Sequence, residues 1–257
     1  MSIHTLNCLT VKAYYPREWE TGALCLLMET ERGLLLIDTG PGLGDYARVP
    51  IMMRALALIT KMPMNPAEAA VCQVTTLGYD PADVVDVVLT HMHFDHCGGL
   101  PDFPQARVHV HRKEYEAFQG PPRSFLDLAY VERHLAHDPE LLLYEETDDH
   151  WFDFPAVRLP FEREIWLIPL SGHTRGHCGM AIRTGDGGSE TWHFHVGGSV
   201  PIGFSRALPA WLTRLMVGPH EARVRAFRTA HPEMTMTTTH MPLSFFEQHP
   251  PAEERPL

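Results

Sequence analysis

The sequence predicts an α/β fold in which strands and helices alternate along the chain. Short apolar segments typical of strands recur in both halves, and amphipathic segments typical of helices lie between them. Of the 257 residues, 44% are hydrophobic and 21% are charged, as in an ordinary globular protein. Compact α/β folds often fill this length as one unit, so we expect a single domain over residues 1–257. A chain of this size also buries enough surface to fold without disulfides.

The N-terminal half begins with three strands and continues as a strand–helix alternation. Dense valine at Asp83–Thr90 is typical of a strand buried on both faces. We expect strands at Thr5–Tyr14, Ala23–Thr30, Gly33–Ile37, Asp83–Thr90 and Val108–His111, and helices at Ala67–Leu77 and Arg112–Phe118.

The C-terminal half repeats this alternation. We expect strands at Glu164–Pro169, Gly179–Arg183, Glu190–Val196 and Met234–Thr239, and a helix at Pro219–Ala230. Two segments fall outside the alternation: a methionine-rich stretch at Tyr46–Asn65, and a polar, helix-prone insertion at about 121–149 without a strand signal. Both could cover a substrate pocket, since methionine offers an adaptable apolar surface. The alternative is that the methionine-rich stretch only fills the core and that the insertion is only a loop on the surface.

Charge, cysteine content and hydropathy narrow the class of protein. The net charge is −11 and no run of Lys or Arg is present, which argues against a nucleic-acid partner. Five cysteines, an odd number without framework spacing, favour reduced thiols in a cytoplasmic protein. No apolar segment reaches the ~18 residues of a membrane span and no secretory signal is evident, so we expect no membrane partner. An apolar segment at Trp211–Val217 is compatible with a homodimer.

Histidines gather where the valine-rich strand ends, in the run His91-Met-His93-Phe-Asp95-His96. In extended backbone, residues two apart project to the same side, so His91 and His93 can bind one ion together. Asp95 and His96 lie beyond the turn and can face a second ion. Imidazoles with a carboxylate suit zinc or another borderline divalent metal. The run therefore predicts a metal site.

These residues resemble the signature of the metallo-β-lactamase superfamily, His-x-His-x-Asp-His. Three further elements are similar to that family and occur in its order along the chain: Asp38-Thr-Gly40, Gly172-His173-Thr-Arg-Gly176-His177, and His240 after a late strand. The resemblance implies a four-layer αββα sandwich with metal at one edge, between the two sheets.

The resemblance also implies which residues bind metal. The first ion would take His91, His93 and His173, and the second would take Asp95, His96 and His240. Asp38 would orient ligand imidazoles through hydrogen bonds. His177 is expected to have a structural role, closing the turn at Gly172–Gly176.

The chain departs from the family pattern at Gly198. Family members normally carry an aspartate there that bridges both metals, in a Gly-Asp-Ala-like context, where this chain has Gly197-Gly198-Ser199. Two adjacent cations repel each other, and a bridging carboxylate offsets that repulsion. We therefore expect a retained first site and a weakened second site. Ser199 or His195 could supply a replacement ligand, and a substitution introduced by design would give the same sequence.

The expected activity is hydrolysis of an ester-type bond in a small molecule (lactone, ester or thioester) by a metal-bound hydroxide that Asp95 orients. The cofactor is expected to be one or two zinc ions, with iron or manganese as alternatives. The pattern resembles the lactonase-like branch, although those enzymes tend to carry a tyrosine where this chain has Pro201. A mononuclear iron oxygenase acting on sulfur compounds and a non-catalytic ligand-binding relative remain as alternatives.

Overall fold

Two β-sheets pack face to face between layers of helices in the computed structural model, which describes residues 3–12, 14, 20–184, 191–200, 214 and 217–250. The first sheet contains β1 (Ile3–Val11), β2 (Thr21–Thr30), β3 (Gly33–Ile37), β4 (Val84–Val88), β5 (Arg107–His111), β6 (Leu141–Tyr144) and β14 (His240–Pro242). The second contains β9 (Val157–Arg158), β10 (Ile165–Pro169), β11 (Cys178–Arg183), β12 (Trp192–His195) and β13 (Thr235–Thr237). A separate ribbon joins β7 (His150–Trp151) to β8 (Phe154–Pro155).

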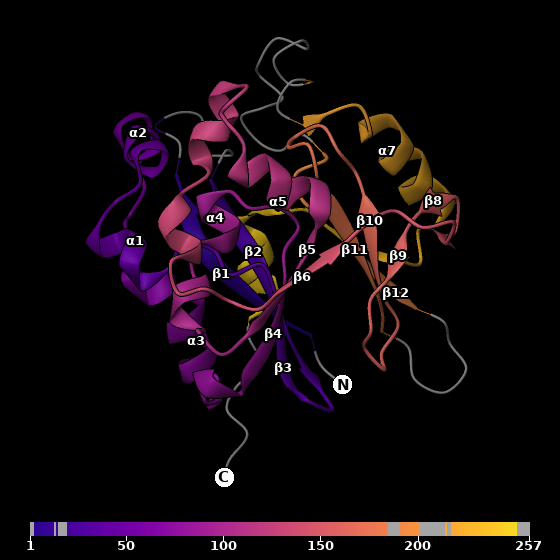
Figure 1. The fold of residues 1–257 in the computed structure, drawn as a ribbon, viewed down its shortest axis with the longest axis horizontal. Coiled ribbons are helices and arrows are strands. Elements are labelled where there is room, and N and C mark those ends of the chain that lie inside the picture. Colours follow the sequence, from indigo (N-terminus) through magenta and orange to yellow (C-terminus); the bar gives the residue numbers. More distant parts are fainter. Residues whose placement is uncertain are drawn as a thin grey trace.

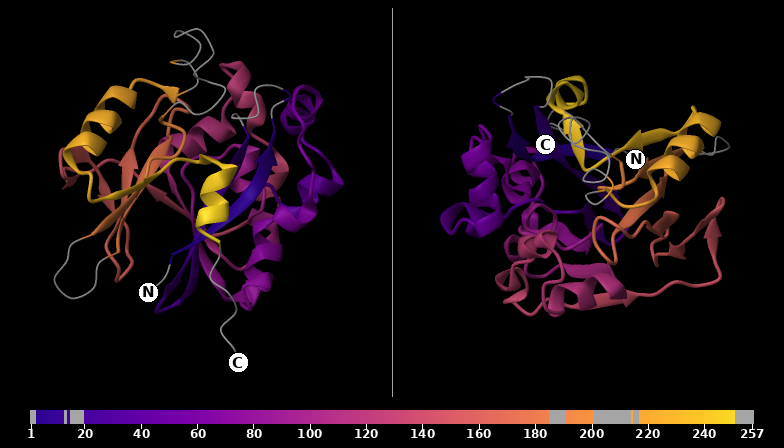
Figure 2. Two further views of the ribbon diagram at one scale, coloured as in Figure 1. Left: turned by 180° about the vertical axis from the view of Figure 1, so that it is seen from behind. Right: turned by 90° about the horizontal axis from the view of Figure 1, so that it is seen from above.

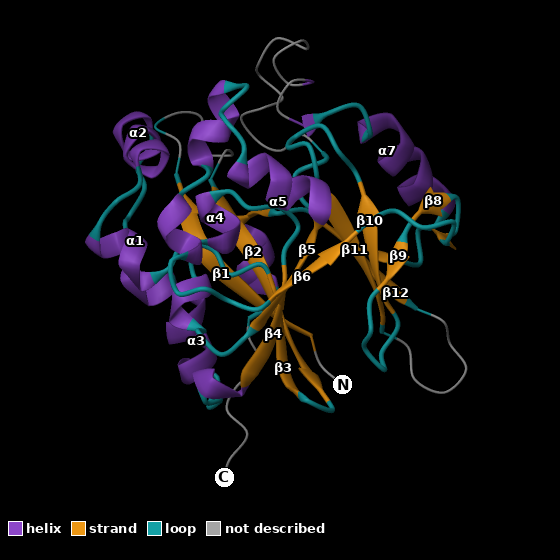
Figure 3. Ribbon diagram, viewed as in Figure 1, coloured by secondary structure: helices purple, strands orange, loops and turns teal. Residues whose placement is uncertain are grey.

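Helices cover the outer face of each sheet (Figures 1 and 3). On the side of the first sheet lie α1 (Leu43–Ala47), α2 (Ile51–Ile59), α3 (Ala70–Thr76), α4 (Phe94–Cys97) and α5 (Arg112–Gln119). The second sheet is covered by α7 (Glu221–Ala230), and α8 (Leu243–Gln248) packs by β1, β2 and β14. Short 3-10 helices complete the fold: η2 (Pro66–Glu68), η3 (Pro81–Asp83), η4 (Leu100–Asp102), η5 (Phe125–Ala129) and η6 (Glu132–Leu135). This is the expected four-layer αββα sandwich.

The alternation of side chains along each strand explains the layers. In β2, Leu24, Leu26 and Met28 face the second sheet, while Cys25 and Leu27 face the helices. On the far side, Phe227 and Val224 of α7 pack on the outer face of the second sheet. Both faces of β2 are buried, which is why the segment reads as a nearly continuous apolar run.

Two sequence expectations need correction. The insertion at 121–149 is not purely helical: it holds two 3-10 helices, and Leu141–Tyr144 forms β6, which pairs in parallel with β5. The methionine-rich stretch, for which no secondary structure was predicted, contains the helix α2. The helix expected at Ala67–Leu77 is divided into η2 and α3. Its break falls at Ala69, whose ψ of 137° is not helical.

Some expectations lie outside the described residues. These are the start of the strand at Glu190 and most of the apolar segment at Trp211–Val217. In the part of the chain that the structure describes, no helix has the length and apolar character needed to cross a membrane.

The last strands connect the two sheets. β13 pairs in parallel with β12 of the second sheet, and β14, three residues later, pairs antiparallel with β2 of the first. The turn between them is fixed at Thr239, whose N–H donates to the carbonyl of Gly197 (3.1 Å) and whose carbonyl accepts from Leu24 (2.6 Å). The view from behind in Figure 2 shows this yellow segment running between the sheets.

Candidate metal centre

The candidate ligands lie on loops at one shared edge of the two sheets. After β4 the chain forms a loop that carries His91 and His93 and then enters α4, whose first turn carries Asp95 and His96. The N–H of Cys178, at the start of β11, donates to the carbonyl of Thr90 (2.9 Å). This bond brings the loop before β11, with His173, against the loop after β4.

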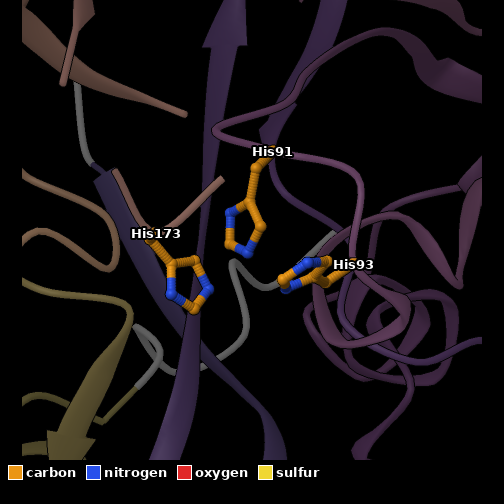
Figure 4. Close-up of side chains that lie close together, drawn as sticks. All are labelled: His91, His93 and His173. Atoms are coloured by element: carbon orange, nitrogen blue, oxygen red, sulfur yellow. The ribbon is translucent and has the colours of Figure 1, made fainter. Parts of the chain in front are cut away.

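His91, His93 and His173 form the first group. Their candidate ligand atoms all lie within 4.8 Å of one another, and Figure 4 shows the three rings around a common space. The Nε2 atoms of His91 and His93 are buried and have no hydrogen-bond partner among the described residues. Burial and the neighbouring imidazoles lower the pKa of both rings well below the usual range. The neutral rings of His91 and His93, whose ligand nitrogens converge with one of His173, fit a divalent cation.

Asp95, His96 and His240 form the second group, whose candidate ligand atoms also lie within 4.8 Å of one another. An oxygen of Asp95 lies 3.6 Å from Nε2 of His96 and 3.6 Å from Nε2 of His240. Burial raises the pKa of Asp95, but His96, His240 and His93 together with a backbone hydrogen bond outweigh it, so that the pKa is lowered overall. The carboxylate is therefore ionised at neutral pH, as a metal ligand must be.

Asp38 holds two of the rings in place. Its carboxylate accepts hydrogen bonds from the Thr90 N–H (2.8 Å), the Thr90 hydroxyl (2.7 Å) and Nδ1 of His96 (2.7 Å). Because the Thr90 hydroxyl donates to Asp38, it can accept from Nδ1 of His91 (3.1 Å). Asp38 has a left-handed φ of 56°, a conformation that an L residue keeps only when its surroundings fix it. These contacts turn Nε2 of His91 and His96 away from Asp38.

Glu114 is a residue of the site that sequence reasoning missed. It is fully buried on α5, and one carboxylate oxygen accepts from the Met92 N–H and the Tyr130 hydroxyl (both 2.9 Å). The other oxygen accepts from the Thr174 hydroxyl (2.6 Å) and the Gly176 N–H (3.0 Å). A single carboxylate thus joins the loop of His91 and His93 to the loop of His173.

A sequence signal for Glu114 does exist. Glu114, Ala117 and Phe118 are spaced i, i+3, i+4, so they share the buried face of α5. A carboxylate on that face must find hydrogen-bond donors in the interior. The loop approaches closely enough only because residue 176 is glycine, since a Cβ there would collide with the backbone of Glu114.

His177 and Gly198 are joined by a hydrogen bond. Nδ1 of His177 lies 3.1 Å from the Leu170 carbonyl, and its Nε2 accepts from the Gly198 N–H (2.8 Å). The ring connects the loop before β11 to the turn after β12, which fits the structural role expected for it. A Cβ on Gly198 would lie 3.3 Å from the His173 ring, so a side chain at this position points toward the first group.

The structure does not bring the suggested replacement ligands into either group. The Ser199 hydroxyl faces Nδ1 of His177 (3.3 Å), and His195 uses Nδ1 to contact the Thr237 hydroxyl (3.0 Å). Neither residue belongs to the two sets of converging donors found among the described residues.

Both groups border one cavity of about 240 Å³. Its other walls are mainly apolar and include side chains from β1, α2 and the insertion: Leu9, Val11, Met52, Leu56, Phe125 and Leu126. The methionine-rich stretch and the insertion therefore do cover a pocket, as one of the two sequence interpretations holds.

The buried histidines predict a stability profile for the metal-free protein. Burial lowers the pKa of His193 to about 4 and of His195 to about 3, and His240 is lowered to about 4 by burial and its neighbours. In the unfolded chain these histidines take up protons near pH 6.5, whereas in the folded protein their rings remain neutral. The free energy of unfolding therefore falls as the pH drops below about 6.5. His96 opposes the trend, because Asp38 and Asp95 outweigh its burial and raise its pKa.

We therefore expect the melting temperature of the chelated protein to be steady above about pH 7 and to fall between about pH 6.5 and 4. Thermal melts followed by circular dichroism in a chelator would measure this. A flat profile over that range would show that these rings are protonated in the folded state.

Comparisons with known proteins agree with the fold and the motifs. A model of the Metallo-beta-lactamase superfamily matches residues 19–188. The chain is 35% identical over 205 residues to a probable metallo-hydrolase of Mycobacterium tuberculosis, covering 77% of this chain and 62% of the relative. It is 28% identical over 165 residues to an N-acyl homoserine lactonase of Bacillus cereus, covering 62% of this chain and 58% of the relative. The chain thus spans about three fifths of the length of these curated relatives.

A solved structure with a similar fold is an N-acyl homoserine lactone hydrolase with the product N-hexanoyl-L-homoserine bound at its catalytic metal centre. The TM-score is 0.62 at 18% identity, over 93% of this chain and 92% of that one. The matched family model and the 35% identity to the mycobacterial relative show that the chain belongs to the metallo-β-lactamase superfamily.

Proposed function

We propose that the protein hydrolyses an ester-type bond (lactone, ester or thioester) in a small molecule with an apolar chain, using zinc. The observation that carries this proposal is the cavity: six candidate metal ligands border it, and most of the remaining wall is apolar. A divalent cation held there supplies Lewis acidity, which activates water as a nucleophile at neutral pH.

The chain's own residues supply the rest of the chemistry. Asp95 is ionised, partly exposed and borders the cavity, so its carboxylate can orient the attacking water, take up the proton that this water loses and pass it to the leaving oxygen. Met52 and Leu56 bind the apolar part of the substrate. Asp38 and Glu114 keep the ligand rings in place through hydrogen bonds.

The metal and the compartment are part of the same proposal. Imidazoles with one carboxylate are a common donor set for zinc. All five cysteines are free thiols. That state supports a reducing compartment, and we propose a cytoplasmic location.

Metal analysis with a substrate series tests the proposal. Protein purified without chelator is analysed by plasma emission spectroscopy and then assayed on lactones, esters and thioesters with short and long acyl chains. We expect at least one zinc per chain and faster turnover of longer chains. One iron per chain with oxygen consumption would replace the proposal by the iron oxygenase, and metal-free protein with no turnover would favour a ligand-binding relative.

Gly198→Asp is expected to raise occupancy of the second metal group. The new side chain points toward His173, and a carboxylate between the groups offsets the repulsion between two cations. The His173 ring must shift by a few tenths of an ångström to admit the Cβ. Metal stoichiometry measured by titration should rise toward two per chain, with Gly198→Asn as the uncharged control. Unchanged stoichiometry would show that another group already serves as the bridge.

A further inference from the structure

A cluster of large apolar side chains is exposed beside the cavity. Ile51, Leu58 and Ile59 of α2 are 74%, 78% and 70% exposed, and Phe125 and Leu128 of η5 are about half exposed. α2 packs beside η5, so these five residues form one surface, here termed the α2–η5 patch. α2 lies at the outer edge of the molecule in Figure 1. Contiguous apolar area of this kind marks a surface that contacts a partner.

The patch continues into the cavity. Ile51, Leu58 and Ile59 project from the outer side of α2, while Met52 and Leu56 of the same helix line the cavity. Phe125 belongs to both, since it is half exposed and also borders the cavity. A molecule bound at the patch is therefore next to the entrance of the candidate active site.

The charge around the patch is opposite to that of the whole chain. Four exposed basic side chains lie within three residues of patch members: Arg48, Arg54, Lys61 and Arg123. Across residues 43–64 and 121–129 the acidic residues are Asp45, which is buried, and Asp127, which accepts the N–H groups of Arg123 and Ser124. The net charge of the chain is −11, so this positive region is a local exception.

We propose that the α2–η5 patch docks the protein on a lipid bilayer that contains anionic head groups. A short helix with exposed isoleucine and leucine beside arginine and lysine suits the interface between head groups and acyl chains. A second copy of the chain fits less well, because a symmetric contact would bring the basic rims together. The further step, in which a membrane-dissolved ester enters the cavity beside the patch, rests on the proposed function.

This proposal goes beyond the sequence expectation of no membrane partner. That expectation depended on the absence of a long apolar segment, which bears on membrane-spanning helices alone. Peripheral docking needs only a patch of surface, and the sequence does not reveal that α2 exposes its apolar side chains.

Vesicle flotation tests the docking without any assay of activity. Full-length protein is mixed with vesicles of phosphatidylcholine alone or with phosphatidylglycerol added, at low salt. We expect flotation with the anionic vesicles. Leu58→Gln/Ile59→Gln should weaken it by roughly tenfold or more through lost apolar burial, and Arg54→Glu should do the same through lost attraction. Arg228→Glu, an equal charge reversal on α7, and Phe152→Gln, on an exposed ring near α7, should bind as the parent does.

The outcomes separate the docking from the hydrolysis. Absence of flotation for the parent protein, or equal flotation of the patch variants, would overturn the proposal. A parent dimer that Leu58→Gln/Ile59→Gln converts to monomer, without vesicle binding, would show that the face binds a second copy. The variants leave the cavity intact and should hydrolyse a short soluble ester at the parent rate. Patch-dependent flotation by a protein that hydrolyses no ester would reject the proposed function and keep the docking surface.

Discussion

Protein with His91→Ala or His93→Ala is expected to lose its tightly bound metal. Each change removes one of the three imidazoles of the first group, and the remaining two donors leave a divalent cation poorly coordinated. The loss of affinity should exceed the roughly 10–100-fold that removal of a hydrogen-bond partner of a ligand costs. Metal content measured after gel filtration should fall, and hydrolysis should fall with it.

The matched control for these variants is His150→Ala. His150 is exposed on β7, where its ring contacts the Asp148 carbonyl of its own loop. That protein should keep the metal content of the parent. A full metal complement in both His91→Ala and His93→Ala would refute the assignment of the first group.

Glu114→Ala is expected to cause the largest loss of stability. The change leaves three buried donors, from Met92, Thr174 and Gly176, and the half-buried hydroxyl of Tyr130 without an acceptor. At about 1–3 kcal/mol for each unsatisfied group, the free energy of unfolding should fall by at least about 4 kcal/mol. For a chain of this size that corresponds to a melting temperature lower by about 8 °C or more.

Two further variants separate the carboxylate from the helix that carries it. Glu114→Gln keeps the shape but turns an N–H₂ group toward two donors, so its melting temperature should lie between those of the parent and the alanine variant. Glu116→Gln, on the exposed side of α5, should melt as the parent does. If Glu114→Ala melted with the parent, water or another acceptor would already satisfy the loops. Because Glu114 joins both ligand loops, metal affinity should fall together with stability.

The sequence predicted the fold wherever a local pattern was strong. β2 and β3 are apolar runs on either side of a tight turn that marks them as a hairpin, and β3 was expected with the bounds the structure gives it. β6 was missed because Leu141–Tyr144 is a short apolar run, which periodicity cannot assign to strand or helix. It becomes a strand because the edge of β5 offers its backbone donors and acceptors, and that edge is a tertiary feature.

The candidate site also contains residues that a local sequence pattern predicts and residues that it does not. His91, His93, Asp95 and His96 are close in sequence, so their spacing alone indicated a metal site. His173 and His240 are remote, and only the resemblance to a family placed them with the others. Glu114 is also remote from its four donors, and no local pattern reports which loops will meet its carboxylate.

The passage from β13 to β14 has a consequence for synthesis on the ribosome. β14 belongs to the first sheet, where it pairs with β2. In the chain it comes after β13, which belongs to the second sheet. A nascent chain that has released β11 already contains His91, His93 and His173, whereas the second group waits for His240. The order of the residues therefore makes the three-histidine group available before the second group, and the strand that covers the edge of the first sheet beside Thr21–Ala23 is synthesised after both β12 and β13.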